Sequence, residues 1–266
     1  MRNLSDIGRI FYGIAIAVIG LETIYYKDFH PYLLPANHAW LPGLVVLAYI
    51  SGALLIFAGA CIVVKKKTRP ASLLLGSVFL LIVCLYYIPY ELISSSKYVH
   101  LGEWENTEKE LALAGGAFVI AGCFPEENET SLTRFLGKLI PSGTVFFSLV
   151  MIGFGVLHFV YAHQVIDYVP SWVPSHLFWI YLAGVGLLGS GTGIILNVQR
   201  RLAATLLGSM IFIWLISLHI PRIIAAPSAD LGDEVISAFL ALAYSGTAFV
   251  IAGCTKIKPS DLSESF

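Results

Sequence analysis

The stretch GGAFVIAGC at residues 115–123 recurs as GTAFVIAGC at residues 246–254, with eight of the nine positions identical. Further matches precede both copies at nearly the same separation: Trp40-Leu41-Pro42 with Trp172-Val173-Pro174, Tyr49 and Gly52 with Tyr181 and Gly184, Leu74–Ser77 with Leu206–Ser209, and Ile88-Pro89 with Ile220-Pro221. Chance does not hold one offset over about a hundred residues. The sequence therefore predicts a tandem duplication.

The composition excludes an ordinary soluble domain. Of the 266 residues, 57% are apolar and only 12% are charged, whereas soluble domains carry roughly a quarter charged residues. Most of the chain therefore has no water to face. The formal net charge of −1 gives no basic field for nucleic acid, and we expect no nucleic-acid partner.

Apolar runs of about 20 residues cross a bilayer as helices, and eight runs qualify: 8–26, 43–64, 71–93, 109–124, 143–163, 176–198, 202–224 and 235–254. The fourth and eighth are short and begin with acidic residues. We predict an all-α polytopic membrane protein of about eight transmembrane helices, built as two four-helix repeats of parallel topology. The predicted divisions are a first repeat (1–127), a cytoplasmic linker (128–142), a second repeat (143–256) and a cytoplasmic tail (257–266).

The basic residues predict the orientation, because cytoplasmic loops are rich in lysine and arginine. With eight spans, one side holds Arg2, Arg9, Lys65, Lys66, Lys67, Arg69, Arg134, Lys138, Arg200, Arg201, Lys256 and Lys258. The other side holds Lys27, Lys97, Lys109 and Arg222. We therefore expect a multi-pass protein of the cell inner (plasma) membrane with both termini in the cytoplasm.

The four cysteines are Cys61, Cys84, Cys123 and Cys254, and none forms a C-x-x-C pair. A disulfide framework or a zinc site needs cysteines at ligand spacing. We expect these four to be small apolar packing residues, and we expect no metal site.

Ionisable residues inside apolar runs are costly and usually face a bundle interior or a cavity. Five of them fall in the last third of odd-numbered spans, and therefore in the outer half of the membrane: Glu22, Glu91, His158, His219 and Arg222. The simpler alternatives are side chains that reach back to interfacial water or structural hydrogen bonds between helices. With neighbouring aromatic residues, the predicted ligand-binding set is Glu22, Tyr25, Tyr87, Glu91, His158, Trp172, His219 and Arg222. No catalytic residue is assigned.

Each half carries the same series of features. A glycine-containing first helix (Gly13 and Gly20; Gly153 and Gly155) leads to a proline-rich outer loop, a glycine-rich second helix, a basic turn, a third helix and a short fourth helix. This pattern resembles the DoxX-like family of four-helix bacterial membrane proteins, here in tandem. The resemblance implies a membrane redox role, as in the family's thiosulfate:quinone oxidoreductase subunit. The absence of long acidic or basic domains indicates that any catalytic partner is a separate chain. The chain lacks the paired cysteines of thiol-redox relatives, so no family catalytic residue is carried over.

We expect the outer-half polar residues to form a pocket for a small lipophilic ligand such as a quinone, as in a redox-accessory protein or oxidoreductase subunit. Its partners would be membrane lipids and a separate redox protein. Three alternatives stay open. The first is a small-solute transporter or channel, although no charged residue lies well inside the cytoplasmic half of a span. The second is a b-type haem protein with His158 and His219 as axial ligands. The third is a structural or assembly partner.

From the sequence alone, replacement of both His158 and His219 by alanine is expected to abolish quinone binding, because these imidazoles would hydrogen-bond the ligand oxygens. Equal quinone affinity in the double variant and the wild type would contradict this prediction.

Protein produced with haem supplied should be scanned for a Soret band. Absence of this band would refute the haem alternative.

Overall fold

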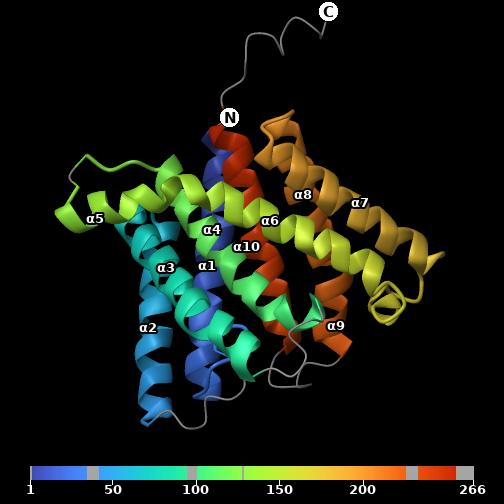
Figure 1. The fold of residues 1–266 in the computed structure, drawn as a ribbon, viewed down its shortest axis with the longest axis horizontal. Helices are drawn as coiled ribbons and strands as arrows, with labels where there is room; N and C mark the ends of the chain where they lie inside the picture. Colours follow the sequence, from blue (N-terminus) through green and yellow to red (C-terminus); the bar gives the residue numbers. More distant parts are fainter. Residues whose placement is uncertain (1, 35–41, 95–100, 128, 226–232, 256–266) are drawn as a thin grey trace, which may run out of the picture.

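The computed structural model describes residues 2–34, 42–94, 101–127, 129–225 and 233–255. Almost all of these residues are helical, and no strand occurs among them (Figure 1). The α-helices are α1 (Arg2–Tyr26), α2 (Leu44–Val63), α3 (Thr68–Ile82), α4 (Glu105–Cys123), α5 (Ser131–Leu136), α6 (Ile140–Val160), α7 (His176–Ile195), α8 (Arg200–Trp214), α9 (Ile220–Ala225) and α10 (Asp233–Cys254). The prediction of an all-α chain is confirmed.

Seven helical stretches in the described part of the chain are long and apolar enough to cross a membrane. They are Asn3–Tyr26, Leu44–Val63, Thr68–Ile93, Ser131–Val160, His176–Ile195, Arg200–Ala225 and Glu234–Cys254. The remaining long helix is α4, which corresponds to the fourth predicted span. Its first two turns carry Glu105, Glu108, Lys109 and Glu110.

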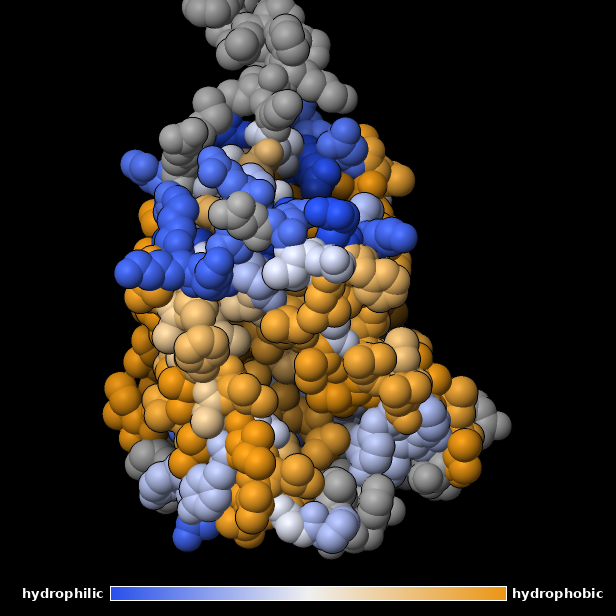
Figure 2. Space-filling view, turned by 90° about the vertical axis from the view of Figure 1, so that its left-hand side faces the viewer, coloured by the Kyte–Doolittle hydropathy of each residue, from blue (hydrophilic) through white to orange (hydrophobic). Residues whose placement is uncertain are grey.

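The outer surface of the helices is apolar. Large side chains such as Leu54, Phe57, Leu85 and Ile93 are more than half exposed, and continuous apolar surface of this kind marks contact with lipid or another protein. Figure 2 shows hydrophilic residues gathered at the end of the molecule where the termini lie, above a broad apolar surface. The first and last described residues lie at this same end (Figure 1).

Prolines shape the ends of the third and eighth helices. The turns Val83–Tyr87 and Leu215–His219 are π-helical, and each ends two residues before a proline, Pro89 or Pro221. A proline within a helix has no N–H to donate and clashes with the preceding turn, and a widened π turn accommodates this defect. These turns carry Tyr87 and His219, two residues of the predicted site.

The helices α4 and α10 lie in the middle of the bundle (Figure 1). The helix α10 packs against α1 and α8, α4 packs against α3 and α6, and the two central helices contact each other. Every residue of α4 from Ala112 to Ala121 is buried. The first helix of the chain thus packs against the last one, and α6 packs against α4.

Glycines bring these helix backbones into direct contact. A Cβ on Gly246 of α10 would lie 2.5 Å from the Gly8 carbonyl oxygen of α1. A Cβ on Gly143 of α6 would lie 2.8 Å from the Gly115 carbonyl oxygen of α4. No side chain fits at such distances. Small residues at helix interfaces allow this approach where lipid supplies no hydrophobic force between helices.

Matching glycine contacts join the first two helices of each half. A Cβ on Gly52 would lie 2.6 Å from the Gly20 carbonyl oxygen, and a Cβ on Gly184 would lie 3.2 Å from the Gly155 carbonyl oxygen. Gly52 and Gly184 are one of the sequence matches between the halves. The same type of contact therefore occurs at corresponding places in both halves.

The structure adds detail to two of the predicted segments. Residues 128–142 contain the helix α5, whose first turn is capped by the Thr130 hydroxyl accepting from the Thr133 amide at 3.2 Å. The fourth helix begins at Glu105 rather than at residue 109, so its acidic residues are helical. The predicted tail, 257–266, lies outside the described residues.

Replacement of Gly246 by alanine should destabilise the protein by about 1–3 kcal/mol, the usual cost of overpacking, because the added methyl group meets the backbone of α1. Thermal unfolding in detergent, followed by tryptophan fluorescence, measures this change. The matched control is Gly189→Ala, where a Cβ meets nothing within 4 Å. If both variants unfold at the wild-type temperature, the close contact is not a structural requirement.

Candidate functional site

The candidate site centres on Glu110, in the second turn of α4. The residue is completely buried, and neither carboxyl oxygen has a hydrogen-bond partner among the described residues. A buried carboxyl group without partners is expensive. Within a membrane protein, such a group is by default a candidate for function.

Four buried tyrosines from four different segments surround Glu110. They are Tyr12 of α1, Tyr32 of the loop after α1, Tyr87 at the end of the third helix and Tyr244 of α10. Each phenol lies close enough to the Glu110 carboxyl group for the two groups to interact electrostatically. The site therefore joins both halves of the chain.

Three of these hydroxyl groups are used by the protein itself. Tyr12 donates to the Leu113 carbonyl at 2.6 Å, and Tyr244 donates to the Lys109 carbonyl at 3.2 Å. These two bonds tie α1 and α10 to the turn of α4 that carries Glu110. The third, Tyr87, donates to the Pro31 carbonyl at 2.5 Å.

The loop after α1 inserts Tyr32 into the bundle. The amides of Leu33 and Leu34 both donate to the His30 carbonyl, at 2.8 and 3.2 Å, and form a tight turn. The Tyr32 ring is 1% exposed, and its hydroxyl has no partner in the described structure. Burial raises the pKa of the Tyr32 phenol well above its ordinary value, so this hydroxyl stays protonated and can donate a hydrogen bond.

Three of the predicted site residues, Glu22, Tyr87 and Glu91, belong to this group. We call the group the Glu110 cluster, and its members are Glu110, Tyr12, Tyr32, Tyr87, Tyr244, Glu22 and Glu91. The charge of Glu22 acts on Tyr32, and one buried Glu22 oxygen has no hydrogen-bond partner in the described structure. The charge of Glu91 acts on Tyr87, and Glu91 is 5% exposed. The cluster is acidic and phenolic, and all of its members except Tyr244 lie in the first half.

His158, His219 and Arg222 lie in the second half. The His158 Nδ1 lies 2.8 Å from the Phe154 carbonyl oxygen, and its ring stacks on Trp214 at 6.0 Å between centroids. The His219 Nδ1 is buried and has no hydrogen-bond partner in the described structure.

Arg222 is held by two partners. Its guanidinium pairs with the carboxylate of Glu234 and lies 4.1 Å from the centre of the Tyr168 ring. Both contacts are close, so a ligand at Arg222 would have to displace one of them.

The structure does not bring Tyr25 or Trp172 into either group. Their side chains are 76% and 73% exposed, and the Tyr25 ring packs edge-on against Tyr26 at 5.0 Å. Exposed aromatic residues near the ends of membrane helices are typical of the membrane–water interface.

Sequence reasoning missed Glu110, Tyr12, Tyr32 and Tyr244. Glu110 lay in the acidic start of the shortest span, where a hydrated helix end was the simpler interpretation. One signal was present, because Ala114, Ala117 and Ala121 follow Glu110 at helical spacing and predict a shared packed face. Tyr32 had no such signal, because it lies in a loop.

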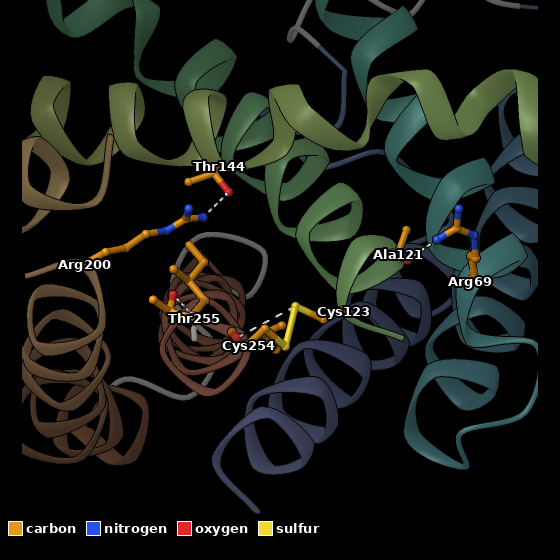
Figure 3. Close-up of a disulfide and its surroundings, with 9 residues drawn as sticks. Arg69, Ala121, Cys123, Thr144, Arg200, Cys254 and Thr255 are labelled. Carbon is orange, nitrogen blue, oxygen red and sulfur yellow. Dashed lines mark hydrogen bonds between the residues drawn. A yellow bond between two sulfur atoms is a disulfide. The ribbon is translucent and has the colours of Figure 1, made fainter. Parts of the chain in front are cut away.

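The interpretation of the cysteines as packing residues is wrong for two of them. Cys123 and Cys254 form a disulfide between the last residues of α4 and α10, with 6.0 Å between their Cα atoms (Figure 3). A sequence separation of 131 residues hides this pairing from any search for local spacing. Cys61 and Cys84 are free thiols.

Known proteins give little further information. A family model described as a domain of unknown function (DUF8561) matches residues 147–240, a range that includes His158, His219 and Arg222 but not Glu110. No curated protein and no solved structure matches the chain. In the described part of the chain, no three His, Cys, Asp or Glu side chains form a group that could hold a metal ion.

Tyr32 and Tyr87 of the Glu110 cluster should respond differently to loss of the hydroxyl group. Tyr87→Phe breaks the hydrogen bond to the Pro31 carbonyl in the loop after α1 and should lower stability by about 1 kcal/mol. Tyr32→Phe removes a hydroxyl without a partner and should leave the stability of ligand-free protein unchanged or raise it. Thermal unfolding of the two variants gives the comparison, and a larger loss in Tyr32→Phe would contradict the assigned bonds.

Proposed function

We propose that the protein is a multi-pass inner-membrane protein that binds a small lipophilic ligand, such as a quinone, at the Glu110 cluster. The observation that carries the proposal is the fully buried Glu110 carboxyl group, whose two oxygens have no partner among the described residues. A few polar groups with unused hydrogen-bonding capacity inside a mostly apolar bundle can orient a specific ligand.

The chemistry of the cluster suits a ligand whose oxygens are hydroxyl groups in one redox state and carbonyl groups in the other. An ionised Glu110 accepts a hydrogen bond from a hydroxyl group such as that of a quinol, whereas a protonated Glu110 donates one to a carbonyl group. The Tyr32 hydroxyl, which stays protonated, supplies a second donor. A carboxyl group able to take either form can exchange a proton with the ligand. The electron-transfer partner would be a separate redox protein.

The finer architecture that we propose is a pair of four-helix units of parallel topology, related by an axis along the membrane normal. The corresponding glycine contacts of the two halves support it. So does the exchange of partners, in which each unit's first helix packs against the other unit's last helix. The series of helices in each unit is also the basis for proposing a DoxX-like relationship.

In the proposed orientation both termini lie in the cytoplasm, as the distribution of lysine and arginine favours. Hydrophilic residues gather at the end that carries the termini (Figure 2). Glu110 precedes Cys123 by thirteen residues of one helix, or about 20 Å. The Glu110 cluster would then lie in the outer half of the membrane.

Proton-coupled transport is a second candidate, because buried carboxyl groups in membrane helices often act in proton relays. The Glu110 carboxyl group, whose oxygens have no partner among the described residues, supports proton-coupled transport more strongly than the sequence alone does. Flux of protons or small solutes in liposomes above the level of empty vesicles would support transport over ligand binding.

Replacement of Glu110 by glutamine should weaken binding of a short-chain quinone at least tenfold, or about 1.4 kcal/mol, because the amide cannot take both proton states. Quenching of tryptophan fluorescence during titration with the quinone measures the affinity.

The matched control is Glu105→Gln on the same helix, whose side chain is 50% exposed and pairs with Lys109 at 2.6 Å. Its affinity should equal that of the wild type. Equal affinities in all three proteins would refute the assigned site, and absence of binding by the wild type would refute the ligand class.

A further inference from the structure

The disulfide lies at the opposite end of the central helices from Glu110. Cys123 and Cys254 are the last residues of α4 and α10, and they occupy equivalent positions in the two matching stretches of sequence. The same pair of helices also meets at Gly116 and Thr247, the second residues of the two stretches. Equivalent residues of α4 and α10 are thus in contact at two positions along the helices, Gly116 with Thr247 and Cys123 with Cys254.

We propose that Cys123 and Cys254 form a thiol–disulfide exchange site whose partner is a dithiol, either a small molecule or a protein, on the cytoplasmic side. The proposal rests on its own observation and uses only the orientation from the proposed function. A separation of about 20 Å along α4 makes the site distinct from the ligand site at Glu110.

The two sulfur atoms differ in access. Cys254 is exposed, whereas Cys123 is partly buried and its sulfur lies 4.0 Å from the Val250 carbonyl oxygen. Thiol–disulfide exchange needs an attacking thiolate to reach one sulfur of the bond. The geometry therefore makes Cys254 the sulfur that is attacked and Cys123 the leaving group.

Positive charge lies over the ring of Phe124, the residue that follows the leaving group. The Arg9 guanidinium and the Lys65 ammonium lie 5.5 and 5.1 Å from the centre of the Phe124 ring, and Phe124 directly follows Cys123. Asp6 contacts both cations, at 3.4 and 3.0 Å, and offsets one of the two charges. The remaining positive charge favours a thiolate at Cys123.

The exchange balances without any further reactant. A thiolate of the dithiol attacks the Cys254 sulfur, the bond between Cys123 and Cys254 breaks, and Cys123 leaves as a thiolate. The second thiolate of the partner then attacks the partner's own sulfur in the mixed disulfide and releases Cys254. The protein disulfide gains two electrons and two protons, and the dithiol loses the same number and becomes a disulfide. The oxidised partner drives the reverse reaction.

Opening of the bond leaves the central packing in place, because Gly116 and Thr247 stay in contact two turns away and the glycine contacts to α1 and α6 are untouched. The disulfide can therefore be reduced and formed again while the protein stays folded.

The test uses the full-length protein with Cys61→Ala and Cys84→Ser, so that only the pair can react. Samples in native detergent are equilibrated with reduced or oxidised dithiothreitol, quenched with acid, and labelled with a large maleimide that shifts migration on a gel. The wild-type chain is run in parallel in case the substitutions disturb folding. Its free thiols, Cys61 and Cys84, add two labels under both conditions.

The proposal predicts two labels per chain after reduced dithiothreitol and none after oxidised dithiothreitol, with interconversion in both directions. Two labels after oxidising treatment would show that the bond does not form. No label after reducing treatment of folded protein would show a closed structural disulfide. Either result overturns the proposal.

Single variants test the assigned roles of the two sulfurs. Both single variants also carry Cys61→Ala and Cys84→Ser. With glutathione disulfide, the Cys123→Ser variant, which keeps the exposed Cys254, should form a mixed disulfide at least about fivefold faster than the Cys254→Ser variant. Equal or reversed rates would overturn the assignment of Cys254 as the attacked sulfur.

Sealed vesicles test the side of the membrane. Membrane-impermeant glutathione should reduce the pair only in vesicles that expose the cytoplasmic face. Reduction from the outer face alone would overturn the cytoplasmic partner and the orientation, without bearing on quinone binding at Glu110.

Discussion

The backbone contact between Gly246 and Gly8, and the one between Gly115 and Gly143, hold the bundle together. At each of them a helix from one half of the chain lies directly on a helix from the other half, at a distance that excludes any side chain. Lipid offers no hydrophobic force to press helices together, so close packing has to supply the attraction. Because α10 rests on α1 and α4 rests on α6, the two terminal helices of the halves become the centre of the molecule.

This arrangement explains how α4 keeps acidic residues in its first two turns. The helices α3, α6 and α10 pack along it, and α1 and α10 bind its Glu110 turn through the Tyr12 and Tyr244 hydroxyls. The protein thus uses its buried tyrosines to fix the backbone near the carboxyl group rather than to neutralise it. The carboxyl group and the Tyr32 hydroxyl are left for another partner, and that is the physical basis of the proposed ligand site.

The sequence predicted the helices well because hydropathy and helix length depend on local composition. It also predicted one ligand-binding set that includes Glu22, Glu91 and Tyr87, all now in the Glu110 cluster. The same set held His158, His219 and Arg222, which lie in the second half. The sequence could not identify Tyr32, because a loop residue enters the bundle only through the turn at His30 and the bond between Tyr87 and Pro31. The pairing of Cys123 with Cys254 escaped for a related reason, since it follows from how α4 and α10 meet rather than from sequence spacing.

The most direct test of the account is mass spectrometry, with an absorption spectrum, of the wild-type protein and the Glu110→Gln variant purified gently from native membranes. The account predicts a quinone, or another lipophilic molecule with hydroxyl or carbonyl groups, with the wild type and its loss from the variant. Phospholipid alone in both preparations, or the same ligand retained by both, would contradict a ligand site at Glu110.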